Sequence, residues 1–118
     1  MRRSILICDD EEGIRESLKL ILEKDHDLAF AESGDDAIQK IKAKPIDIVI
    51  LDVKMPKKDG LATLKEIRKI NPSLKVIIAT GYKSADIAQE ALQLGASDYI
   101  IKPFNRDVIK KTVEKLAL

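Results

Sequence analysis

The sequence is poor in several residue types that mark particular classes of protein. It has one cysteine, Cys8, no tryptophan and only 3% aromatic residues in 118 positions. One cysteine cannot form an internal disulfide or build a cysteine-based zinc site. So few aromatic rings leave no stacking platform for nucleic-acid bases. We therefore expect Cys8 to be a small buried hydrophobic residue.

Excess charge and long hydrophobic runs are also absent. The formal net charge is +1, which gives no electrostatic basis for direct binding to nucleic acid. No apolar run reaches the roughly 18 residues that a membrane span needs. The first residues lack the hydrophobic core and the cleavage site of a secretory signal. We expect a cytoplasmic protein that binds neither nucleic acid nor a membrane.

What the sequence does contain is a regular alternation of two patterns. Short apolar runs typical of buried strands lie at 4–8, 28–31, 48–51, 75–80 and 98–101. Apolar residues at helical spacing follow each run, within 14–22, 37–41, 61–70, 84–94 and 108–116. Strict alternation predicts a parallel sheet with right-handed crossovers, covered by helices on both faces. The strand order is left open by this pattern.

Local signals mark where several of these elements begin and end. Ser33 is predicted to cap the second helix and Gly95 to end the fourth. Gly81 is predicted to form a tight turn after the fourth strand, and Glu11 is interpreted as an acid that caps the first helix. His26 lies between two aspartates and is predicted to be a solvated surface residue.

Polar residues follow four of the predicted strands at their carboxyl ends. Asp9 and Asp10 come after the first strand, Asp52 after the third, Thr80 after the fourth and Lys102 after the fifth. Because the carboxyl ends of parallel strands meet at one edge of the sheet, we expect these side chains to converge.

The chemistry of that set points to phosphoryl transfer. Crowded carboxylates repel one another and favour a cation, and all-oxygen ligands suit Mg²⁺. Asp52 supplies a nucleophile, Lys102 a positive charge for phosphoryl oxygens and Thr80 a hydroxyl donor. Phosphoryl transfer needs these groups because its catalysis depends on positioning and electrostatic stabilisation.

Taken in order, these residues resemble the receiver domain of bacterial two-component response regulators. The motifs that carry the resemblance are Asp9-Asp10, Asp52, Met55-Pro56-x-x-Asp59-Gly60, Thr80-Gly81 and Gly95-Ala96-x-Asp98-Tyr99-x-x-Lys102-Pro103-Phe104. They cover essentially the whole chain. The resemblance implies a flavodoxin-like (βα)5 three-layer sandwich whose five-stranded parallel sheet has the order 2-1-3-4-5. It also implies that residues 1–118 form a single receiver domain.

The resemblance implies a role for each residue at the carboxyl edge. Asp52 would accept a phosphoryl group from the phosphohistidine of a sensor kinase or of a phosphotransfer protein. Asp10 would bind Mg²⁺ or Mn²⁺ directly, with Asp9 assisting through water. Asp52 and the backbone carbonyl of Lys54 would complete the protein ligands, and Lys102 would pair with the phosphoryl group.

The resemblance also implies a switch. Thr80 would move to hydrogen-bond the phosphoryl group, and Tyr99 would turn inward into the vacated space. The surface of the fourth helix, fifth strand and fifth helix would then rearrange for a downstream partner, for an output domain of the same protein or for a second phosphorylated copy. We also expect a cis peptide bond between Lys102 and Pro103. Lys57 and Lys58 are predicted to lie in a solvated loop.

The leading hypothesis is thus a signalling phosphoacceptor rather than a turnover enzyme. A stand-alone phosphorelay intermediate is the nearest alternative. An aspartate-nucleophile phosphatase would need a second acid at the position of Lys54, and a flavin carrier would need a phosphate loop where acids occupy 9–12. A pseudo-receiver that is never phosphorylated would not need Asp52, Thr80 and Lys102 together.

Overall fold

The computed structural model describes residues 2–55, 59–81 and 85–117, which form strands and helices in strict alternation. The strands are β1 (Ser4–Cys8), β2 (Asp27–Ala31), β3 (Ile48–Asp52), β4 (Lys75–Gly81) and β5 (Asp98–Lys102). The helices are α1 (Glu12–Leu22), α2 (Gly34–Ala43), α3 (Gly60–Ile70), α4 (Ala85–Gln93) and α5 (Arg106–Leu116). The predicted alternation of strands and helices is confirmed.

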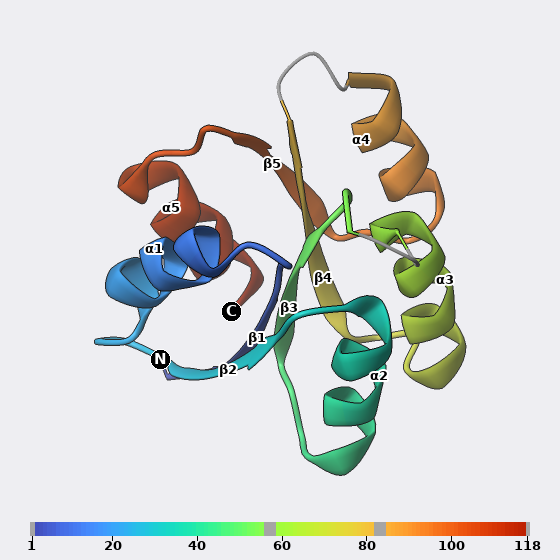
Figure 1. Ribbon diagram of the computed structural model, residues 1–118, viewed down its shortest axis with the longest axis horizontal. Helices are drawn as coiled ribbons and strands as arrows, with labels where there is room; N and C mark the ends of the chain where they lie inside the picture. The colour runs from blue at the N-terminus through green and yellow to red at the C-terminus, as the bar shows by residue number, and fades with distance from the viewer. Residues whose placement is uncertain (1, 56–58, 82–84, 118) are drawn as a thin grey trace.

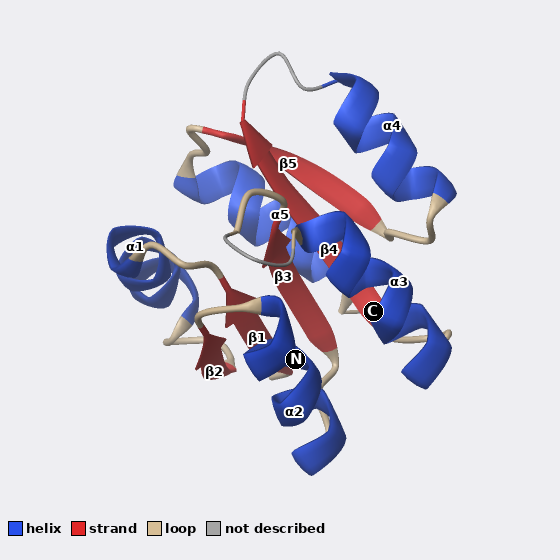
Figure 2. Ribbon diagram, turned by 45° about the vertical axis from the view of Figure 1, so that its right-hand side comes forward, coloured by secondary structure: helices blue, strands red, loops and turns tan. Residues whose placement is uncertain are grey.

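The five strands form one parallel sheet in the order β2-β1-β3-β4-β5, as predicted (Figure 2). The chain first builds outward from β1 to β2 and then crosses back to place β3 on the other side of β1. This reversal leaves the carboxyl ends of β1 and β3 side by side with helices leaving on opposite faces. In open parallel sheets such a reversal is where ligands bind.

The helices cover the sheet in two layers, with α1 and α5 on one face and α2, α3 and α4 on the other (Figure 1). Alternate residues of β3 belong to different cores. Val49 and Leu51 pack with residues of α2, α3 and α4, whereas Ile48 and Ile50 pack with residues of α1 and α5. All five residues of β3 are buried. A strand buried on both faces is apolar at consecutive positions, which explains the continuous run in the sequence.

Among the helix starts that the structure describes, three have a side chain that accepts a backbone N–H, and one of the three was predicted. Ser33 accepts the N–H of Asp36 before α2, as expected, and Asp59 and Asn105 cap α3 and α5 in the same way. Glu11 occupies the N-cap position of α1, as interpreted, but its side chain makes no capping hydrogen bond.

His26 lies at the amino edge of the sheet, far from the predicted site, but it is not solvated as predicted. The residue is 7% exposed, and its ring Nδ1 accepts the backbone N–H of Arg3 at 3.1 Å. Its own N–H donates to the carbonyl of Leu22 at the end of α1. Burial lowers the pKa of His26 against the opposing charge of Asp25. The prediction relied on the polar aspartates on either side of His26, which do not determine whether its ring is buried.

Gly81 also differs from its prediction, because it is the last residue of β4 and pairs with Lys102 of β5 rather than forming a turn. The predicted features at Pro56, Lys57, Lys58 and Ser84 lie outside the described residues. No helix in the described ranges has the length and apolar character needed to cross a membrane.

Candidate functional site

The site lies at the carboxyl edge of the sheet, where β1, β3, β4 and β5 bring their ends together. Asp9 follows β1, and Asp52 and Lys102 are the last residues of β3 and β5. Thr80 lies one residue before the end of β4 and is 3% exposed. An open hollow of about 170 Å³ is lined there by Glu11, Asp52, Val53, Lys54, Thr80, Gly81 and Lys102. The structure thus brings together residues that are separated by more than ninety positions in the chain.

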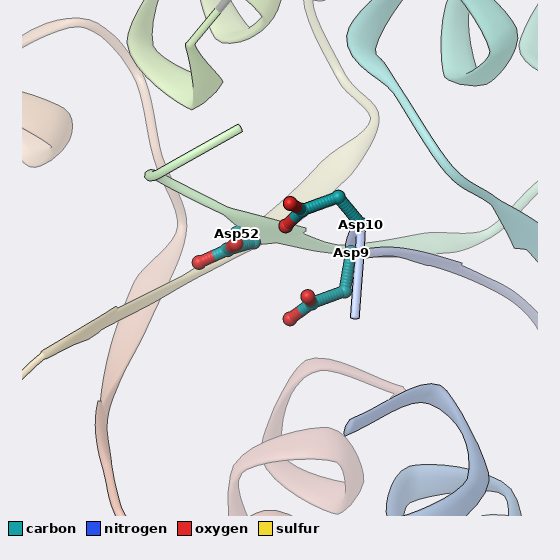
Figure 3. Close-up of side chains that lie close together, drawn as sticks. All are labelled: Asp9, Asp10 and Asp52. Atoms are coloured by element: carbon teal, nitrogen blue, oxygen red, sulfur yellow. The ribbon is translucent and has the colours of Figure 1, made fainter. Parts of the chain in front are cut away.

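Three carboxylates gather at this edge. Asp9, Asp10 and Asp52 each place one oxygen within 4.8 Å of the others, and their carboxylates point into a common space (Figure 3). Asp9 and Asp52 are buried, at 2% and 4% exposure, whereas Asp10 is exposed. This set of hard oxygen ligands could hold a metal ion, and it fits Mg²⁺, which takes one or two carboxylates and keeps several waters.

Lys102 lies between two of these acids. Its ammonium is 3.1 Å from an oxygen of Asp9 and 3.0 Å from an oxygen of Asp52, with a side chain that is 20% exposed. One positive charge therefore faces two buried carboxylates and a third nearby. Among the residues that the structure describes, the cluster keeps an excess of negative charge, which is the electrostatic condition for binding a cation.

The buried charges shift one another's pKa values. Burial raises the pKa of Asp52, the hydrogen bond from Lys102 opposes that shift, and the charge of Asp9 adds to it. Burial acts to lower the pKa of Lys102, but its hydrogen bonds and charge interactions with Asp52 and Asp9 raise it overall. Lys102 thus stays charged, while Asp52 is harder to ionise than an exposed aspartate. A nearby cation would favour the ionised form of Asp52.

A glycine fixes the backbone beneath Asp52. Gly60 begins α3, and its N–H donates to the carbonyl of Val53 at 2.8 Å. A Cβ atom at this position would lie 2.2 Å from the carbonyl oxygen of Asp52 and 2.7 Å from the Cα of Val53. No larger residue fits without moving the end of β3. The sequence marked Asp59-Gly60 only as the close of a turn, so this close approach was missed.

The other predicted residues occupy this edge in different ways. Lys54 lines the hollow, and its backbone N–H hydrogen-bonds to Asp52, which lowers the pKa of that carboxyl group. Tyr99 lies in β5 and is 38% exposed, so its side chain faces outward. The peptide bond between Lys102 and Pro103 is cis, which is the predicted isomer. Glu11 also lines the hollow, which no local signal in the sequence indicated.

Cys8 lies next to the site but takes no part in its chemistry. It is 1% exposed, as predicted, and its thiol donates to the carbonyl of Ser33 at 3.3 Å. Burial, together with the charges of Asp9 and Asp52, raises the pKa of Cys8 to about 12. Since the thiolate is the reactive form, Cys8 is chemically inert at neutral pH.

Comparison with known proteins identifies relatives over nearly the whole chain. Residues 5–114 match the family model of the response regulator receiver domain. The chain is 41% identical to the transcriptional regulatory protein ZraR of Salmonella typhimurium over 94% of its length, and it spans only 25% of that relative. It is 38% identical to the sporulation initiation phosphotransferase F of Bacillus subtilis, covering 98% of this chain and 94% of that protein.

Solved structures agree with this relationship. The crystal structure of a response regulator receiver domain protein from Clostridium thermocellum superposes with a TM-score of 0.90 at 35% identity, covering 97% of this chain and 93% of that one. The first relatives, which include ZraR, are about four times as long as the matched region. The similarity to them therefore concerns one part of those proteins.

Proposed function

This chain belongs to the response regulator receiver domain family, and we propose that it accepts a phosphoryl group from a phosphohistidine onto Asp52. The observation that carries the proposal is the contact of one ammonium, that of Lys102, with the carboxylate of Asp52 beside two further carboxylates. A buried nucleophile, a fixed positive charge and a set of oxygen ligands for a divalent cation are the groups that phosphoryl transfer requires.

In the proposed step an oxygen of Asp52 attacks the phosphorus atom of the phosphohistidine. A P–O bond forms as the P–N bond breaks, and the departing electron pair stays on the imidazole nitrogen, which takes up a proton. Lys102 pairs with the phosphoryl oxygens. Asp10, Asp9, Asp52 and the carbonyl of Lys54 would hold Mg²⁺ or Mn²⁺. When bound, the ion would supply positive charge that offsets the carboxylates and the phosphoryl oxygens.

The switch that follows would link Thr80 of β4 to the surface formed by α4, β5 and α5. Thr80 would hydrogen-bond the phosphoryl group, and Tyr99 would turn inward from its exposed position. Four large apolar side chains on α4, β5 and α5 are between 38% and 44% exposed: Leu92, Tyr99, Ile101 and Val108. Apolar side chains exposed on adjacent elements support docking of a protein partner at this surface.

Two forms of this function differ in the fate of the phosphoryl group. In the first, residues 1–118 form a receiver domain that controls a downstream partner, an attached output domain or a phosphorylation-linked dimer. In the second, the chain passes the phosphoryl group on in a phosphorelay, the form suggested by its 38% identity to the sporulation initiation phosphotransferase F. Both place the protein in the cytoplasm beside a histidine kinase or a phosphotransfer protein.

The experiment is incubation with acetyl phosphate and Mg²⁺, followed by intact mass measurement. We expect one added phosphoryl group on the unchanged chain, none on Asp52→Asn and none when a chelator removes the metal. Asp27→Asn at the opposite edge of the sheet is the matched control and should be phosphorylated normally. Phosphorylation of Asp52→Asn to the same extent as the unchanged chain would contradict the assignment, as would no mass change in any sample.

A further inference from the structure

Arg15 is the one cation of α1 that reaches back to the acidic loop between β1 and α1, among the residues that the structure describes. Its Nη1 donates to the backbone carbonyl of Asp9 at 2.7 Å. Its Nη2 lies 3.7 Å from a carboxylate oxygen of Glu32, in the loop after β2. The Arg15 side chain is 15% exposed, whereas that of Glu32 is 77% exposed. The hydrogen bond to Asp9 is thus the stronger contact, since exposed ion pairs contribute little.

This hydrogen bond completes the restraint of Asp9. The backbone N–H of Asp9 donates to Ala31 at 3.1 Å, and its two carboxylate oxygens accept from the N–H of Glu11 at 2.9 Å and from Lys102 at 3.1 Å. The carbonyl held by Arg15 is the remaining polar group of the residue. Every polar group of Asp9 is therefore engaged by a different element of the fold.

The restraint matters for the next residue. The carbonyl of Asp9 belongs to the peptide plane that leads into Asp10, so holding it restrains the positions of the backbone N and Cα from which the Asp10 side chain starts. Within the described parts of the chain the Asp10 carboxylate makes no hydrogen bond of its own, and it is exposed. Its position among the three acids thus depends on its backbone.

We propose that Arg15 is a positioning residue that holds the Asp9–Asp10 peptide so that Asp10 faces Asp52 across the cation site. The inference rests on the proposed binding of a divalent cation by these acids. A guanidinium near three carboxylates could also weaken cation binding through its charge. Arg15, however, makes its hydrogen bond to a carbonyl and not to any of the three carboxylates, and its removal should weaken Mg²⁺ binding if geometry dominates and strengthen it if charge dominates.

The test is the dissociation constant for Mg²⁺, measured by titration calorimetry on the full chain without a phosphodonor. We expect Arg15→Met to bind Mg²⁺ about tenfold more weakly, the lower end of the effect seen when a residue that orients a metal ligand is removed. Arg15→Lys keeps the charge and one donor but loses the planar fork, so its affinity should fall between the two. Arg106→Met removes an exposed charge at the start of α5 and should bind like the unchanged chain.

Thermal unfolding of each variant establishes that it is folded, and if Arg15→Met does not fold, Arg15→Lys carries the comparison. Unchanged or tighter Mg²⁺ binding by a folded Arg15 variant would overturn the positioning role. Loss of a positive charge by itself favours cation binding, so equal weakening in Arg106→Met would show that the effect is not specific to the hydrogen bond of Arg15, and it would overturn the positioning role as well. If the unchanged chain itself binds no Mg²⁺, the proposed metal role fails, and this inference fails with it. Failure of the proposed metal role appears in the unchanged chain, whereas failure of the positioning role appears only in the Arg15 variants.

Discussion

At the amino edge of the sheet each arginine donates hydrogen bonds to a carboxylate or to backbone carbonyls, whereas at the carboxyl edge the described carboxylates outnumber the cations that contact them. Arg2 donates to the carboxylate of Asp27 and to two backbone carbonyls, and Arg3 donates to the carbonyl of Ala117 at the end of α5. At the other edge, within the described ranges, Lys102 is the one side-chain cation that contacts the two buried carboxylates, with Asp10 close by.

The two edges therefore contribute differently to the protein. Matched charges and satisfied carbonyls at the amino edge hold the strand ends and α5 together. Unmatched carboxylates at the carboxyl edge oppose folding, because burying an incompletely paired charge costs free energy. Sites that break the rules of stable packing are expected where a protein binds or reacts. The comparison predicts that replacing an aspartate by asparagine raises the free energy of unfolding at the carboxyl edge and lowers it at the amino edge.

The largest effect is expected where the carboxyl edge depends on close backbone contact. Gly60→Ala should lower the free energy of unfolding by about 3 kcal/mol, the upper range for forcing extra atoms into a packed site. The added Cβ would meet backbone atoms of Asp52 and Val53, which cannot turn away as a side chain could. Urea denaturation measures the change.

Gly13→Ala is the matched control for Gly60→Ala. Gly13 also lies in the first turn of a helix, but a Cβ there would meet nothing within 4 Å. We expect a gain of about 0.5 kcal/mol, because alanine loses less backbone entropy than glycine on folding. A loss at Gly13 equal to that at Gly60 would show that the glycines matter for helix initiation and not for close approach.

A smaller effect of opposite sign is expected at Asp52. Because the pKa of Asp52 is higher in the folded protein than its ordinary value of 3.8, the folded state binds the proton more tightly. Stability should therefore fall as pH rises from 3.8 through the raised value. Asp52→Asn removes this cost, so we expect it to raise the free energy of unfolding by about 1 kcal/mol at pH 7.

The pH dependence separates this cause from a change in packing. The difference between the unchanged chain and Asp52→Asn should shrink with falling pH and vanish below 3.8, where the carboxyl group is protonated in both states. Urea denaturation at a series of pH values, without divalent cations, gives the comparison. A difference that persists at low pH would mean that Asp52 does not oppose folding through its charge.

The smallest effect is expected for the same substitution at the amino edge. Asp27→Asn breaks the ion pair with Arg2, whose atoms lie 2.8 Å apart and whose side chains are 53% and 69% exposed. We expect a loss of about 0.5 kcal/mol at low salt, because exposed pairs are weak and are screened by ions. The loss should diminish as sodium chloride is added. A gain in stability here would remove the contrast between the two edges.

The sequence predictions are accurate for features that depend on neighbouring residues and less accurate for features that depend on residues distant in the chain. Element types depend on neighbours along the chain, so the run at 4–8 predicted β1 to the residue and Ser33 predicted the cap of α2. The environment of His26 depends on residues distant in the chain. Its ring accepts a hydrogen bond from Arg3, and it lines a hollow of about 460 Å³ together with Lys110 and Glu114 of α5. Its polar sequence neighbours could not reveal that burial.

The sequence by itself determined the alternation of strands and helices and the residue types that stand at each strand end. That is sufficient for a parallel sheet, because burial on both faces and short connections leave few other arrangements. Only the tertiary structure decided the charge balance of the site, the contact of Lys102 with both Asp9 and Asp52, and the hydrogen bond from Arg15 to the carbonyl of Asp9. The physical reason is that electrostatic free energy sums over groups close in space, and here those groups are distant in the chain.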